Sequence, residues 1–148
     1  MNIEIEDTDQ GFDKLMKTLR GLDGQAAYVG LFEPELATRG HRHELGEGVP
    51  ERPWLGPATD QATQRGLTVA ANELGLALDG KQSGAEALAV TGAVFENAAR
   101  TYVEAGNVGG PPLTELAKRR DPRKLIDTGE MIGALETRVA DSIEGEDA

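Results

Sequence analysis

Between about Ala58 and Ala105 the sequence favours helix almost without interruption, and this stretch constrains the fold most. It is rich in alanine, and its larger apolar residues recur at three- and four-residue steps. The main break lies at 79–84, so we predict one helix from about Ala58 to Leu78 and a second from about Gly84 to Ala105. One side of the second helix is predicted to carry Leu88, Thr91, Gly92, Phe95, Ala98, Ala99 and Tyr102.

Short segments with strand periodicity lie on either side of this helical stretch. Residues 2–6, 26–32 and 136–143 alternate apolar and polar side chains, and we expect 26–32 to be a central strand. A helix between the first two is predicted from an apolar stripe of Phe12, Leu15, Met16, Leu19 and Leu22. This order of elements predicts an α+β fold, in which helices pack on one face of a small, mostly antiparallel sheet.

Proline and glycine interrupt the rest of the chain. We expect 34–57 and 106–127 to be extended arms, the first with at most one helical turn near His43. Residues 128–135 are predicted to form one or two helical turns, and 144–148 an acidic, solvated tail. No linker separates two parts, so residues 1–148 are interpreted as a single domain.

Composition narrows the classes of function. The 148 residues carry a net charge of −11, which argues against a protein that grips nucleic acid through Lys and Arg but suits a surface past which DNA slides. There is no cysteine for a disulfide, a thiolate nucleophile or a metal site. No run approaches the roughly 20 apolar residues of a membrane span, and the first residues do not resemble an export signal. Phosphate-loop, dinucleotide and Ser/His/Asp motifs are absent from the sequence.

Two short motifs flank the helical stretch. The first is His43-Glu44-Leu45-Gly46 followed by Val49-Pro50-Glu51-Arg52-Pro53-Trp54-Leu55. The second is Leu125-Ile126-Asp127-Thr128-Gly129-Glu130-Met131-Ile132, followed by Leu135-Glu136-Thr137-Arg138-Val139. In their order and spacing, between about Tyr28 and Val139, these motifs resemble the virion morphogenesis, or tail-completion, family of tailed bacteriophages.

The resemblance implies a structural neck protein without a catalytic site or cofactor. Such a protein joins tail to head as a ring of identical copies, commonly six, around the DNA channel. Its expected partners are its own copies, neighbouring neck and tail-tube proteins, and genomic DNA that passes through without sequence-specific binding. Its expected place is the virion neck after assembly in the host cytoplasm, with no membrane partner.

Within the first motif, Arg52, Pro53 and Trp54 are candidate anchors of the fold or of an interface. We expect Trp54 to bury against the long helix near Phe95 or Tyr102, with Arg52 bonded to a carboxylate or to helix-end carbonyls. In the second motif, Asp127 or Thr128 is expected to cap the helix that follows Gly129. The basic cluster Lys118, Arg119, Arg120, Arg123 and Lys124 is either a solvated loop or an inter-subunit arm.

Two catalytic alternatives and one binding alternative stay open. Asp127-Thr128-Gly129 matches the catalytic loop of aspartic proteases, which needs a second such aspartate from a dimer. Too few residues follow Gly129 to complete a protease lobe. His41 and His43 would share one face of a strand and form half of a zinc site in a metal-dependent hydrolase. The third alternative is an acidic, host-directed protein that mimics DNA.

Overall fold

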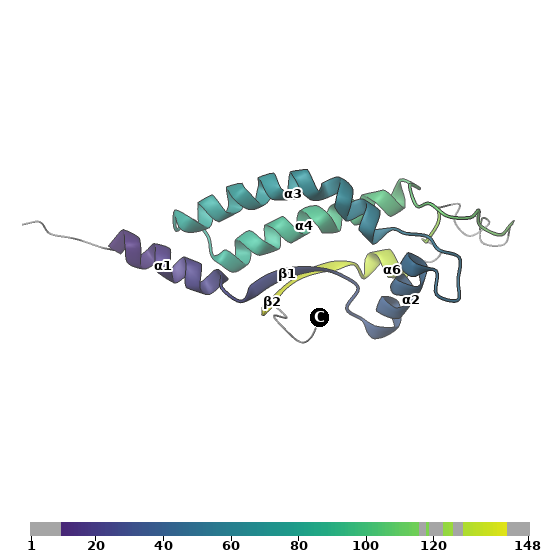
Figure 1. Cartoon of the computed structure of the whole chain (residues 1–148), viewed down its shortest axis with the longest axis horizontal. Coiled ribbons are helices and arrows are strands. Elements are labelled where there is room, and N and C mark those ends of the chain that lie inside the picture. Colours follow the sequence, from purple (N-terminus) through teal and green to yellow (C-terminus); the bar gives the residue numbers. More distant parts are fainter. Residues whose placement is uncertain (1–9, 116–117, 119–122, 126–128, 142–148) are drawn as a thin grey trace, which may run out of the picture.

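The computed structural model describes residues 10–115, 118, 123–125 and 129–141, and the fold is α+β as predicted. Its elements, in chain order, are α1 (Gln10–Leu22), β1 (Gln25–Gly30), α2 (Pro34–Leu45), α3 (Leu55–Leu78), α4 (Gly84–Glu104), α6 (Glu130–Gly133) and β2 (Glu136–Asp141). Figure 1 shows three layers, with α3 stacked on α4 and α4 lying on one face of the sheet. None of the helices in the described ranges is long and apolar enough to cross a membrane.

The two predicted long helices form an antiparallel hairpin. α3 begins at Leu55, somewhat before the predicted start, and α4 begins with a capping box in which Ser83 and Glu86 bond reciprocally to each other's backbone N–H. The helices approach closely at Gly66, where an added Cβ would collide with the Phe95 ring. Gly66 therefore lowers the intrinsic helix propensity of α3 but permits tight packing of α3 on α4.

The sheet has two strands among the described residues. β1 and β2 pair antiparallel, from Gln25 opposite Asp141 to Gly30 opposite Glu136. Gly92 of α4 lies directly against Thr137 and Ala27, so both strands turn these side chains toward α4. In this part of the chain β1 pairs with β2 alone and is not a central strand, while the strand predicted at 2–6 lies outside the described residues.

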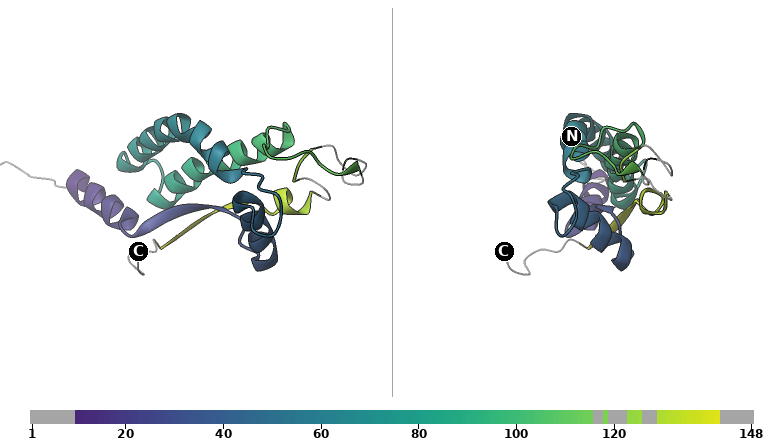
Figure 2. Two further views of the ribbon diagram at one scale, coloured as in Figure 1. Left: turned by 45° about the vertical axis from the view of Figure 1, so that its right-hand side comes forward. Right: turned by 90° about the vertical axis from the view of Figure 1, so that its right-hand side faces the viewer.

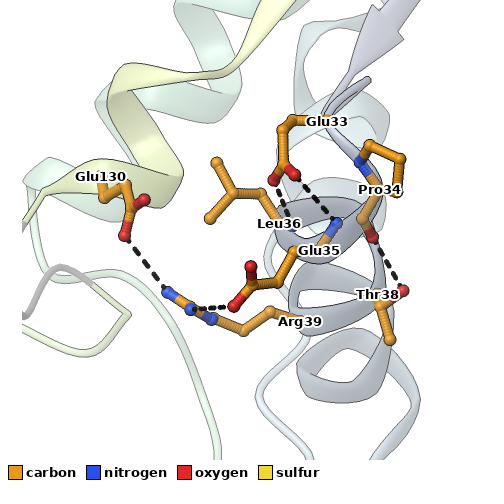
Figure 3. A network of polar contacts seen from close by, with 7 residues as sticks. All are labelled: Glu33, Pro34, Glu35, Leu36, Thr38, Arg39 and Glu130. Carbon is orange, nitrogen blue, oxygen red and sulfur yellow. Dashed lines mark hydrogen bonds and ion pairs between the residues drawn. The ribbon is translucent and has the colours of Figure 1, made fainter.

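The prediction of an extended arm over 34–57 was wrong, because α2 occupies its first half. The Glu33 carboxylate accepts hydrogen bonds from the backbone N–H groups of Glu35 and Leu36, at 3.3 and 2.8 Å (Figure 3), and Pro34 takes the first helical position. Gly46, with φ of 74°, ends the helix and donates its N–H to the Arg42 carbonyl. Only the segment between Gly46 and Trp54 is left without helix.

The second predicted arm, 106–127, is described only in part. Its early portion folds back onto the domain, because Val108 is buried in the core and the Lys124 ammonium donates to the Gly110 carbonyl at 2.8 Å. The core cluster consists of Trp54, Ala58, Ala99, Val103, Val108, Met131, Ile132 and Leu135. The predicted tail at 144–148 lies outside the described residues.

Candidate functional site

The two sequence motifs meet at the end of the molecule where α2, the start of α3 and α6 come together (Figures 1 and 2). Trp54 is the centre of this junction, with 2% of its surface exposed, and it packs in one cluster with Met131 and Ile132 of α6. Its indole N–H donates to the Gly40 carbonyl of α2 at 3.3 Å. Three elements distant in sequence therefore share one aromatic side chain. We name the set Gly40, Glu44, Arg52, Trp54 and Met131 the motif junction.

Glu44 joins the two halves of the first motif. Its carboxylate accepts hydrogen bonds from three consecutive backbone N–H groups at the start of α3: those of Trp54 at 2.7 Å, Leu55 at 3.0 Å and Gly56 at 2.8 Å. The N-cap residue of α3 is Trp54, whose own side chain forms no cap hydrogen bond. Glu44 thus supplies from α2 the acceptor that a local Ser, Thr or Asp normally provides. Sequence reasoning missed this role, for which the only signal was the lack of a local cap.

Gly40 allows α2 to approach the indole. A Cβ at this position would lie 2.7 Å from Leu31 Cδ1 and 3.3 Å from Trp54 Cζ2. This glycine is one of the prolines and glycines that led to the prediction of an extended arm over 34–57. In the structure it is a buried helical residue, because contact between α2 and Trp54 leaves no room for a side chain.

Arg52 is buried beside this contact, with 8% of its surface exposed. Its backbone N–H donates to the His43 carbonyl at 2.7 Å, and its guanidinium donates through Nη2 to the Pro111 carbonyl at 3.3 Å. The expected carboxylate or helix-end partner is thus replaced by a loop carbonyl. Arg52 Nε and His43 Nδ1 are both buried, and neither has a hydrogen-bond partner among the described residues. Burial, followed by the positive charges of Arg52 and Arg39, lowers the pKa of His43 below 6.5 and favours the neutral imidazole.

The second motif reaches the junction through α6. The residue at the N-cap of α6 is Gly129, with φ of 76° and no side-chain cap, instead of the expected Asp127 or Thr128. Those two residues lie outside the described ranges. Glu130 forms an ion pair with Arg39 of α2 at 3.7 Å, and Arg39 also pairs with Glu35 at 3.7 Å (Figure 3). Because both pairs are exposed, they contribute little to the stability of the fold.

Arg100 of α4 holds the chain that follows α6. Its guanidinium donates to the carbonyls of Ile132 at 2.8 Å and Leu135 at 3.0 Å, and to Glu96 Oε1 at 3.2 Å. The other Glu96 oxygen accepts from the Thr137 hydroxyl at 2.8 Å. This network fixes the start of β2 on α4. Sequence reasoning missed it, although the spacing of Glu96 and Arg100 is that of an ion pair on one helix face.

The geometry assumed for a zinc site at His41 and His43 was wrong. Both histidines lie on α2, not on a strand, and residues two apart on a helix do not face each other. His41 is exposed and lies 3.8 Å from Glu47, while His43 is half-buried. Over the described ranges, no group of three His, Cys, Asp or Glu side chains is arranged to hold a metal ion.

The basic cluster is only partly visible. Lys118 pairs with Glu115 at 2.9 Å, and Lys124 donates to the carbonyls of Gly109 at 3.3 Å and Gly110 at 2.8 Å. Arg123 is exposed, and Arg119 and Arg120 lie outside the described residues. At least Lys124 therefore bonds within its own chain.

Comparison with known proteins yields no matching family model, no similar curated protein and no similar solved structure.

Proposed function

We propose that this chain is a structural subunit of the neck of a tailed bacteriophage, a tail-completion protein that works as a homo-oligomeric ring around the DNA channel. The observation that carries the proposal is the set of hydrogen bonds from the Trp54, Leu55 and Gly56 backbone to the Glu44 carboxylate. These bonds join the two halves of the first motif, on which the resemblance partly depends.

The hydrogen bonds give the spacing of the two segments a physical cause. A glutamate on α2 and an Arg-Pro-aromatic segment before α3 form one structural device, in which the glutamate caps the helix that the aromatic residue begins. The second motif contributes Met131 and Ile132 to the packing of the same aromatic ring. Motif residues that contact one another in the folded chain support the family resemblance more strongly than the same residues would if they were scattered over the surface.

Charge and exposed apolar surface also support an assembly role. A net charge of −11 suits a channel through which DNA passes without adhering. Large apolar side chains on α1 and α3 remain exposed, among them Phe12 at 55% and Leu67 at 61%. Exposed apolar side chains of this kind favour association, because contact between copies removes them from water.

The direct test is imaging and native mass measurement of the purified protein, alone and mixed with isolated phage tail tubes. We expect a ring of uniform stoichiometry, sixfold according to the resemblance, either free or seated on tube ends. A protein that remains monomeric alone and leaves tube ends bare would contradict the proposal.

The hydrolase alternative predicts a different result in the same preparation. Under the assembly proposal, Asp127→Asn forms rings as the wild type does, and neither protein cleaves peptides. Peptide cleavage by the wild type that disappears in Asp127→Asn would establish the alternative instead.

A further inference from the structure

Helix α1 projects from the domain with part of its apolar stripe uncovered. Figures 1 and 2 show it extending beyond the end of the hairpin where α3 and α4 join. Its last residue, Leu22, is fixed there, because a Cβ on Gly84 would lie 2.6 Å from the Leu22 side chain. Phe12 lies about 15 Å further along the helix axis. Phe12 and Leu19 are exposed at 55% and 42%, although they belong to the same stripe as half-buried Leu15 and Met16.

A second exposed apolar surface lies on the outer side of α3. Leu67 is exposed at 61% and Leu74 at 40%, and exposed Ala71 lies between them. These three positions follow helical spacing, so they form one stripe along the helix. α4 packs on α3 at the Gly66 contact with Phe95, and no element among the described residues covers this stripe.

The two surfaces are complementary in charge. α1 carries three cations, Lys14, Lys17 and Arg20, against the single carboxylate of Asp13. α3, which bears the exposed stripe, carries the opposite excess, with the carboxylates of Asp60 and Glu73 against the single cation of Arg65. A basic amphipathic helix beside an acidic, apolar helical surface on the same chain is the arrangement expected of two surfaces that recognise each other between copies.

We propose that α1 of one copy docks along the exposed Leu67–Leu74 stripe of α3 on the next copy. Within its own chain α1 contacts α3 and α4, yet Leu67 and Leu74 stay exposed, because Leu22 is held at Gly84 and the Phe12 end of α1 extends beyond the hairpin. The contact joins two different surfaces and is therefore head-to-tail, the type that repeats until a ring closes. This inference rests on the proposed assembly role and specifies the surfaces that carry it.

The absence of cysteine from the chain allows a direct cross-linking test. Phe12→Cys and Leu67→Cys are made in separate chains, mixed and oxidised, so that any disulfide between them joins two copies. Leu45→Cys is the matched control, since Leu45 on α2 is exposed at 55% but lies outside the stripe. We expect disulfide-linked heterodimers from the Phe12 and Leu67 variants and several-fold fewer from the Phe12 and Leu45 variants.

Charge substitutions test the same contact by its effect on assembly. Phe12→Asp and Leu67→Asp should each weaken self-association by about tenfold or more, because each places a carboxylate in an apolar contact. Both positions are exposed, so the melting temperature of the protomer should change little. The control Leu45→Asp should assemble as the wild type does.

The outcomes separate this inference from the proposed function. Rings that form normally while Phe12→Cys links no better to Leu67→Cys than to Leu45→Cys would overturn the docking contact and leave the ring assignment standing. Selective linkage together with tube ends that stay bare would support the contact and contradict the neck assignment.

Discussion

The Glu44 carboxylate accepts a hydrogen bond from the Trp54 backbone N–H at 2.7 Å, across ten residues of chain. Together with the bonds to Leu55 and Gly56, it satisfies N–H groups that a helix leaves without an intrahelical partner. The bond also fixes the backbone of Trp54, whose indole fills the core between α2, α4 and α6. Capping and core packing at this end of the molecule are consequently coupled through two side chains.

Replacement of Glu44 by alanine should therefore destabilise the domain. Three backbone N–H groups at the start of α3 would lose their acceptor, which we expect to lower the free energy of unfolding by about 1–3 kcal/mol. Urea denaturation followed by circular dichroism measures the change. The matched control is Glu47→Ala. The Glu47 carboxylate is exposed and lies 3.8 Å from His41 Nε2, so this substitution should change the free energy of unfolding by less than about 0.5 kcal/mol. Equal effects of the two substitutions would show that Glu44 is not a cap.

Two glycines inside helices should respond to alanine in opposite directions. Gly40→Ala would bring a methyl group 2.7 Å from Leu31 Cδ1 and should destabilise by about 1–3 kcal/mol. Gly75 lies in α3 with nothing within 4 Å of an added Cβ, so Gly75→Ala should stabilise by up to about 1 kcal/mol through helix propensity. Thermal unfolding of both variants checks the contrast, and stabilisation by Gly40→Ala would refute the close packing of α2 on Trp54.

Trp54→Ala should lower stability by about 3–5 kcal/mol, because it leaves a cavity in the core and deprives the Gly40 carbonyl of its indole partner. Trp54→Phe keeps most of the volume and should cost less. Since Trp54 is the only tryptophan, its fluorescence also reports unfolding of the wild type directly. If Trp54→Ala kept wild-type stability but lost assembly, the residue would belong to an interface and not to the core.

The stability of the domain should fall on the acid side of pH 6.5 partly through His43. Burial and the neighbouring arginines lower its pKa in the folded state, whereas the unfolded chain has the ordinary value of 6.5. The unfolded state therefore binds a proton first as the pH falls, so the contribution of His43 is present above pH 6.5 and lost below it. Unfolding measured at several pH values should show a smaller loss between about pH 7 and pH 5 in His43→Gln than in the wild type. An unchanged pH dependence would contradict the depressed pKa, and His41→Gln is the exposed control.

Much of the fold was predictable because its signals are local. The long helices, the break between them, the strand after α1 and the closing strand follow from apolar periodicity and from glycine and proline, which act through residues a few positions away. Helix α2 shows the limit of prediction from local patterns. Its start at Glu33 and Pro34 and its end at Gly46 carried helix signals, but Gly40 and the nearby glycines and prolines indicated a loop. The cost of a helical glycine is about 1 kcal/mol, and contact with Trp54 and Leu31 outweighs it.

The α+β class, the two long helices and the strands at 25–30 and 136–141 could be predicted from the amino-acid sequence, since each depends on the spacing of residues along a short segment. Three contacts became visible in the folded chain alone: Glu44 caps α3, the Gly40 carbonyl accepts the indole N–H, and α6 packs on the same ring. These contacts join segments that meet only when the end of α2 lies against the start of α3. Their geometry depends on the arrangement of whole helices, which no pattern within one segment encodes.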